Sequence, residues 1–227
     1  MDRNFKVRVA VGVGLFVAAL VSLYTLRGVP FKVLYWLFSL VAALELFSFF
    51  SKKKITTLGM VLAVLELGFL VGGCIFAMKT DAHYFWYIIL GVCGYDTFAY
   101  LFGKAIGGKI FKKSRPFSYV SKNKTWEGTI FGLLFSLLFV SVYMLTTGDT
   151  ELYFLLCGPL ALVGDLFESF LKRQFKIKDS NEILIKHKFF RELEYLVGGS
   201  EGHGGFLDRI DSIAFTATML ILLAYVF

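Results

Sequence analysis

The sequence predicts an all-α protein, a polytopic integral membrane helical bundle of about seven transmembrane helices. Of its 227 residues, 57% are hydrophobic and only 18% are charged. The mean hydropathy of +0.69 lies outside the range of ordinary soluble domains. Apolar runs long enough to cross about 30 Å of hydrocarbon also recur along the chain. The expected spans are residues 7–26, 31–50, 55–78, 84–103, 128–147, 152–170 and 210–227.

The first run is interpreted as a retained helix. Arg3, Lys6 and Arg8 precede it, as basic residues precede the apolar core of a signal peptide. The run is nevertheless long, and no small-residue cleavage site separates it from the next apolar run.

The distribution of basic residues predicts the orientation. Of the 24 Lys and Arg residues, all but Arg27, Lys32 and Lys79 fall on one side of the expected spans. Because basic residues accumulate in cytoplasmic loops, this side is expected to be cytoplasmic. The prediction is a multi-pass protein of the cytoplasmic (inner) membrane, with a cytoplasmic N-terminus and with two long segments, 104–127 and 171–209, facing the cytoplasm.

The chain is expected to form a single membrane domain with two parts. Residues 1–80 are predicted to be scaffold helices and residues 81–227 a catalytic region. Glu45 and Glu66 stand within apolar runs of the scaffold, where a charge costs about 2.5–3.5 kcal/mol. They are therefore expected to be protonated, paired across helices or near a polar cavity, and a structural role is preferred to a catalytic one.

Two pairs of glycines four residues apart predict close helix packing. They are Gly68 with Gly72 and Gly128 with Gly132. Small residues at this spacing allow two transmembrane helices to approach closely.

The first of three polar clusters combines an acid within a span and a basic loop. Asp96 falls inside the fourth expected span, where a lone carboxylate suggests function. The stretch from Lys104 to Lys124 would attract anionic headgroups or polyphosphate, although topology alone also explains a basic loop.

The segment 103–109 resembles a phosphate-binding loop, but Ile110 replaces the required Ser or Thr and no strand precedes it, so that interpretation is rejected.

The second and third clusters add carboxylates at two helix ends. Helical spacing places Asp165, Glu168 or Ser169, and Lys172 on one face. Glycines precede Asp208 and Asp211, and the last helix is expected to offer free N–H groups to an anion at its start. Plain helix capping is the alternative explanation for these aspartates. Together the clusters predict a site for magnesium and polyphosphate, because hard cations take oxygen ligands and share them with phosphates.

The motifs resemble the signature of the phosphatidate cytidylyltransferases, also called CDP-diacylglycerol synthases. The resemblance covers about residues 94–215, and the motifs that carry it are Asp96-Thr97-x-Ala99-Tyr100, Lys124-Thr125-Trp126-Glu127-Gly128, Gly164-Asp165-x-x-Glu168-Ser169, Ser169-x-Leu171-Lys172-Arg173 with Lys178-Asp179, and His203-Gly204-Gly205-x-x-Asp208-Arg209-x-Asp211.

This resemblance implies an Mg²⁺-dependent nucleotidyltransferase that joins CTP to phosphatidic acid in phospholipid biosynthesis. The products are CDP-diacylglycerol and pyrophosphate. Asp165 and Asp208 are the implied metal ligands. The implied catalytic residues are Asp165, Asp208, Asp211, Lys172 and Arg173. The implied substrate-binding residues are Asp96, Lys124, Thr125, Glu168, Ser169, Lys178, Asp179, His203, Gly204, Gly205 and Arg209. The expected partners are CTP, phosphatidic acid and membrane lipids, with a homodimer implied by analogy and no nucleic acid.

The sequence departs from the family pattern between Asp179 and His203, where the connection is longer than usual. An insertion in a loop costs little free energy, so activity is still expected. Its mixture of aromatic, aliphatic and basic residues is expected to lie on the bilayer surface.

Three alternatives stay open from the sequence. The first is CTP-dependent modification of another membrane lipid, such as archaeol phosphate or a polyprenol. The second is a transporter, in which Glu45, Glu66 and Asp96 would line the pathway. The third is a non-catalytic relative, which the intact acidic and basic motifs argue against.

Overall fold

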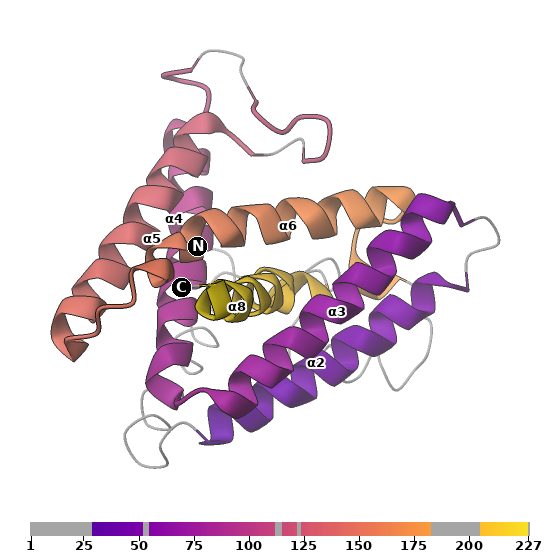
Figure 1. Ribbon diagram of the computed structural model, residues 1–227. Helices are drawn as coiled ribbons and strands as arrows, with labels where there is room; N and C mark the ends of the chain where they lie inside the picture. Colours follow the sequence, from indigo (N-terminus) through magenta and orange to yellow (C-terminus); the bar gives the residue numbers. More distant parts are fainter. Residues whose placement is uncertain (1–28, 52–54, 112–114, 122–123, 183–204, 227) are drawn as a thin grey trace, which may run out of the picture.

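The computed structural model describes residues 29–51, 55–111, 115–121, 124–182 and 205–226 (Figure 1). Within these ranges all regular structure is helical. The elements are α2 (Val29–Phe49), α3 (Thr57–Lys79), α4 (Ala82–Ile106), α5 (Trp126–Thr147), the short 3₁₀ helix η1 (Leu152–Leu156), α6 (Cys157–Gln174), the 3₁₀ turn η2 (Ser180–Glu182) and α8 (Leu207–Val226).

Five helical segments are long and apolar enough to cross a membrane, judged by length and composition. They are Lys32–Phe49, Thr57–Lys79, His83–Ile106, Trp126–Thr147 and Leu152–Gln174. They coincide with five of the expected spans, although α4, α5 and α6 extend further into the segments expected to be loops. The expected span 7–26 lies outside the described residues. The expected span 210–227 corresponds to α8, which is not among the five, so the count of about seven is not confirmed.

Helix α8 lies at the centre of the bundle (Figure 1). The antiparallel pair α2 and α3 covers one side of it, the pair α4 and α5 stands on another, and α6 crosses the third. Contacts with α3, α6, α2 and α4 surround α8. The polar start of α8 is therefore held inside a shell of apolar helices.

Contacts between helix ends show which ends lie together. At one end of the bundle, Thr56 just before α3 contacts Gln174 of α6, and Lys172 of α6 contacts Asp208 of α8. At the other end, the Tyr87 hydroxyl near the start of α4 lies 2.7 Å from the Thr147 hydroxyl that ends α5. Thus α3 and α8 begin where α6 ends, and α4 begins where α5 ends.

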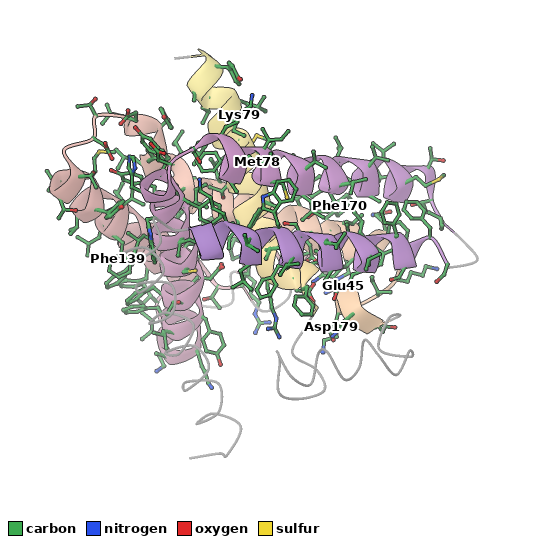
Figure 2. All side chains as sticks on the ribbon, turned by 90° about the horizontal axis from the view of Figure 1, so that it is seen from below. Glu45, Met78, Lys79, Phe139, Phe170 and Asp179 are labelled. Atoms are coloured by element: carbon green, nitrogen blue, oxygen red, sulfur yellow. The ribbon has the colours of Figure 1, made fainter. Side chains whose placement is uncertain are left out.

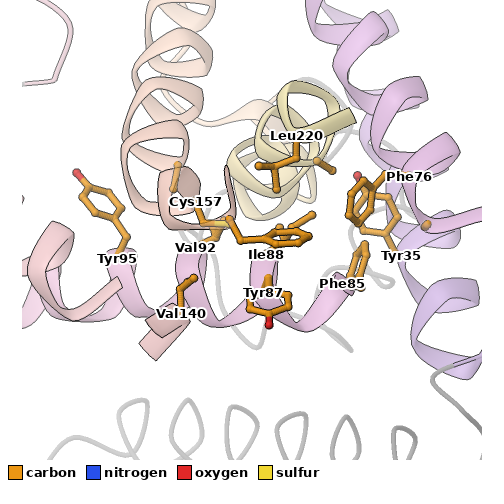
Figure 3. Close-up of a cluster of buried hydrophobic side chains, with 14 residues drawn as sticks. Tyr35, Phe76, Phe85, Tyr87, Ile88, Val92, Tyr95, Val140, Cys157 and Leu220 are labelled. Carbon is orange, nitrogen blue, oxygen red and sulfur yellow. The ribbon is translucent and has the colours of Figure 1, made fainter. Parts of the chain in front are cut away.

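Two clusters of buried side chains hold the helices together. One gathers around α4, where Tyr87, Ile88 and Val92 meet Phe76 of α3 and Leu220 of α8 (Figure 3). The other joins α2, α3, α6 and α8. Lipid tails are as apolar as these side chains, so close packing, rather than escape from water, stabilises such contacts between spanning helices.

The contact surface between α4 and α5, called the seam below, combines glycines with stacked aromatic rings. A Cβ atom added to Gly128 would lie 2.5 Å from the Ala99 carbonyl oxygen, and one added to Gly132 would lie 2.9 Å from the Ala99 Cβ. Beside these contacts, the Phe98 and Phe135 rings stack with centroids 3.7 Å apart. The prediction for this glycine pair is confirmed.

The other predicted glycine pair behaves differently at its two positions. Gly72 packs against Thr218 of α8, whereas a Cβ on Gly68 would meet nothing within 4 Å. The prediction is therefore wrong for Gly68, which lies on the outer face of α3.

Replacing Gly132 by Ala is expected to lower the free energy of unfolding by about 1–3 kcal/mol, because the new methyl group overpacks the seam. The matched control Gly68→Ala has room for its methyl group and is expected to leave stability unchanged or raise it by about 0.5–1 kcal/mol. Denaturant unfolding in detergent micelles measures both variants. Equal stability of the two would contradict this account of the seam.

Candidate active site

A cavity of about 560 Å³ opens where α4, α6 and the start of α5 meet. Side chains of both charges line it: Asp96 and Lys104 from α4, Lys124 just before α5, and Asp165 from α6. Small residues form the wall where α4 and α5 approach most closely. The result is a polar chamber between largely apolar helices.

An ion pair crosses this cavity. The Lys124 ammonium group pairs with the Asp165 carboxylate, and the two side chains are 17% and 33% exposed. Ser169, one turn further along α6, donates a long hydrogen bond of 3.4 Å to the other Asp165 oxygen. Thr125 lines the cavity and also caps α5, because its hydroxyl oxygen accepts from the Gly128 amide at 3.2 Å.

A second cluster joins α6 to the start of α8. The Lys172 ammonium lies 2.7 Å from a Glu168 oxygen and 2.7 Å from an Asp208 oxygen. The other Asp208 oxygen accepts from the Gly205 amide at 2.7 Å and from the Ser180 amide at 3.2 Å. One lysine therefore bridges two acidic side chains from two helices.

These contacts keep Asp208 ionised. Burial alone would raise its pKa, but the interactions with the Glu168 carboxyl, the Lys172 ammonium and the Gly205 amide outweigh burial. Together they hold the pKa of Asp208 below its ordinary value.

The first amides of α8 are already occupied. Those of Phe206 and Leu207 donate to the Glu45 carboxylate of α2, each at 2.9 Å. Figure 2 shows Glu45 on α2 beside the start of α8. The sequence-based expectation of free N–H groups at this helix start is wrong for these two amides, because a carboxylate distant in sequence takes the place predicted for an anion. The expectation that Glu45 is paired across helices is confirmed.

Asp211 connects the two clusters electrostatically. It is buried, with the residue 6% exposed, and its side chain lies within electrostatic range of Asp165, Glu66 and Asp96. It also repels Glu168 on the other side. The acidic residues thus share one polar interior, crossed by α3, α4, α6 and α8.

The structure brings together most of the predicted site residues. Those in or next to the two clusters are Asp96, Lys124, Thr125, Asp165, Glu168, Ser169, Lys172, Gly205, Asp208 and Asp211. His203 and Gly204 lie outside the described residues.

Four other predicted site residues contact neither cluster through the bonds described. Arg173, Lys178 and Arg209 are exposed, and Asp179 is half-buried. Arg173 donates to the Ile177 carbonyl at 3.3 Å, and the Arg209 guanidinium lies 5.9 Å from the centre of the Phe206 ring. Their predicted roles in catalysis or substrate binding stay predictions.

Among the described residues, no three His, Cys, Asp or Glu side chains converge on a point that could hold a metal ion. The two predicted metal ligands, Asp165 and Asp208, each face a lysine instead. Any metal at this site would therefore need ligands from elsewhere, such as a bound phosphate.

Two residues at or beside the cavity were not among the predicted site residues. Lys104, which begins the basic stretch expected to attract polyphosphate, lines the cavity, 5.8 Å from the centre of the Tyr100 ring. Glu127 is buried, and one of its oxygens accepts from the Ile110 and Phe111 amides at 3.1 and 3.0 Å, which ties the segment after α4 to α5. The position of Glu127 in the Lys-Thr-Trp-Glu-Gly motif was the available signal.

Replacing Lys172 by Met is expected to destabilise the protein by about 3–5 kcal/mol, because Glu168 and Asp208 would be buried side by side without a cation. The double variant Lys172→Met, Glu168→Gln should recover part of the loss, since one of the two charges is gone. Lys109→Met is the control, because Lys109 is exposed and its ammonium donates to a backbone carbonyl. Denaturant unfolding in micelles measures the three. Wild-type stability of the single variant would contradict the bridging role.

The sequence is similar to curated proteins named phosphatidate cytidylyltransferase. One from Staphylococcus haemolyticus is 37% identical over 172 residues, which are 72% of this chain and 56% of the relative. One from Helicobacter pylori is 38% identical over 54% of this chain and 42% of the relative. One from Staphylococcus aureus is 35% identical over 76% of this chain and 62% of the relative. The matches thus span about half the length of these relatives. No solved structure matches the chain.

A family model described as the Cytidylyltransferase family matches residues 60–187. The match includes Asp96, Lys124 and Asp165 and ends before the start of α8. Because it covers more than half of the sequence, the chain belongs to the Cytidylyltransferase family.

Proposed function

We propose that this protein transfers a cytidylyl group from CTP to phosphatidic acid, forming CDP-diacylglycerol and pyrophosphate. The observation that carries the proposal is the cavity in which Lys124 and Asp165 meet between apolar helices. A polar chamber in a membrane bundle suits a reaction between a water-soluble nucleotide and a lipid headgroup. Family membership and the names of the relatives support the same reaction.

The basic side chains of the cavity would bind the phosphates. Two lysines line it: Lys104, near the end of α4, and Lys124, just before α5. In the absence of substrate, Lys124 is neutralised by Asp165. A triphosphate entering the cavity would compete with Asp165 for this ammonium group, since phosphates are strong acceptors of charge-assisted hydrogen bonds.

Magnesium fits the donor set of the site. Mg²⁺ prefers oxygen ligands and is usually held by one or two carboxylates together with substrate phosphates. Asp165 and Asp208 are the proposed ligands. When bound, the ion would neutralise the triphosphate and increase the electrophilicity of its α-phosphorus. Lys124, beside Asp165, would bind the phosphates.

The chemistry requires no protein nucleophile. An oxygen of the phosphatidic acid phosphate forms a bond to the α-phosphorus of CTP, and the bond from that phosphorus to the bridging β-phosphate oxygen breaks. Pyrophosphate leaves with the electron pair. The protein contributes positioning and charge neutralisation, the main sources of catalysis in such transfers.

The site is proposed to face the cytoplasm in a multi-pass protein of the inner membrane, with a cytoplasmic N-terminus. The site lies at the bundle end where α4 ends and α5 begins. That end belongs to the side that carries nearly all Lys and Arg residues. A homodimer, expected by analogy with the family, stays a prediction.

Incubating purified protein with labelled CTP, Mg²⁺ and a panel of lipid phosphates tests the proposal. Label is expected in CDP-diacylglycerol when phosphatidic acid is supplied. Label only in products of archaeol phosphate or a polyprenol would identify a different acceptor. Absence of label from every lipid product would refute cytidylyl transfer.

Asp165→Asn is expected to reduce turnover about 10²-fold or more, because the substitution removes a charge from the centre of the cavity. Asp149→Asn provides the matched control. Asp149 accepts a hydrogen bond from Tyr87 at 2.8 Å at the opposite end of the bundle, so turnover should stay near wild type. Steady-state kinetics with CTP and phosphatidic acid measure both. Equal losses in the two variants would contradict the location of the site.

A further inference from the structure

Glu45 is the one residue of α2 that reaches the polar interior through hydrogen bonds in the described part of the chain. Its carboxylate is buried, with the residue 3% exposed. It accepts from the amides of Phe206 and Leu207 and, at 2.8 Å, from the Ser180 hydroxyl. A carboxylate with three donors is satisfied in an apolar surrounding, where an unpaired one would be costly.

These three donors come from two separate segments. Ser180 belongs to η2, and the two amides belong to Phe206, just before α8, and to Leu207, its first residue. The connection between η2 and α8 contains the unusually long stretch between Asp179 and His203. Glu45 on α2 therefore binds both segments that carry the signature motif, η2 and the start of α8.

Asp208 binds the same two segments from its own side. Its Oδ2 atom accepts from the Ser180 and Gly205 amides, while its Oδ1 atom faces Lys172. Gly205 lies between the two carboxylates, and a Cβ atom there would collide with Glu45 and with the Ser180 hydroxyl. We call the contact between η2 and the start of α8 the junction. Glu45 holds this junction together, and the position of Asp208 depends on it.

We propose that Glu45 is a positioning residue for cytidylyl transfer, which sets the place of Asp208 by holding η2 against the start of α8. This inference rests on the proposed function. It also assigns the first α8 amides to an internal carboxylate, so that the substrate phosphates bind at the lysine-lined cavity and not at this helix start.

Glu45→Gln tests the inference through kinetics. The amide side chain keeps one acceptor oxygen but loses the charge and places an NH₂ group against an N–H donor. The kcat for CTP is expected to fall about 10- to 100-fold, as is typical when a residue supporting a catalytic group is changed. The KM for CTP should change little, because Lys104 and Lys124 lie in the other cluster. Ser39→Ala, a buried hydroxyl on the same helix that makes none of these contacts, should keep the wild-type kcat.

Two further measurements separate positioning from simple destabilisation. Hydrogen exchange should show loss of protection at the Phe206 and Leu207 amides in Glu45→Gln, with the rest of the bundle unchanged. In Glu45→Ala, added formate should restore part of kcat, because a free carboxylate can occupy the vacated place between the donors. Ser180→Ala removes a single hydrogen bond and should lower kcat while the protein stays folded.

The outcomes distinguish this inference from the proposed function. If wild-type protein labels no lipid phosphate, the proposed function fails, whereas exchange at the α8 amides still reports on the junction. If wild-type protein is active and folded Glu45→Gln retains the wild-type kcat, the positioning role is refuted. Should Glu45→Gln fail to fold, wild-type kcat in Ser180→Ala would refute it instead.

Discussion

A carboxylate within an apolar helix bundle is costly unless it is protonated or meets a cation or several hydrogen-bond donors, and contacts of the last two kinds organise much of the polar interior of the protein. Asp165 meets Lys124, Glu168 and Asp208 share Lys172, and Glu45 takes two amides and a hydroxyl. Apart from the Glu168–Lys172 pair within α6, each pairing joins different elements of the chain. The same polar contacts that fill the interior therefore also hold its helices together.

The fold was largely predictable because its main determinant is hydropathy along the chain. Runs of apolar residues located α2 to α6 to within a few residues of their observed bounds. The exact ends were less predictable, because polar residues extend the helices past the apolar runs. Lys104 near the end of α4 lines the cavity, and Glu127 at the start of α5 accepts from the Ile110 amide. The three charged residues near the start of α8 likewise separate it from the purely apolar spans.

The site was predictable only where its contacts are local or belong to a recognised motif. Helical spacing placed Asp165, Glu168 or Ser169, and Lys172 on one face, yet the structure divides this face into two neighbouring rows. Asp165 and Ser169 contact each other at the cavity, while Glu168 and Lys172 turn towards α8. Which way each row points depends on the helix packed against it, and spacing within α6 contains no such information. The Glu45 contacts join residues 161 and 162 positions apart. At such a separation, a single sequence does not indicate which residues of two helices face each other.

The seam between α4 and α5 limits how the cavity can change shape. With backbone close to backbone at Gly128 and Gly132 and phenyl rings stacked alongside, these two helices form a stiff hairpin that leaves little room for side chains to rearrange. Two walls of the chamber therefore behave as one solid body. Any widening or narrowing of the chamber would therefore come from α6, the helix that faces this pair.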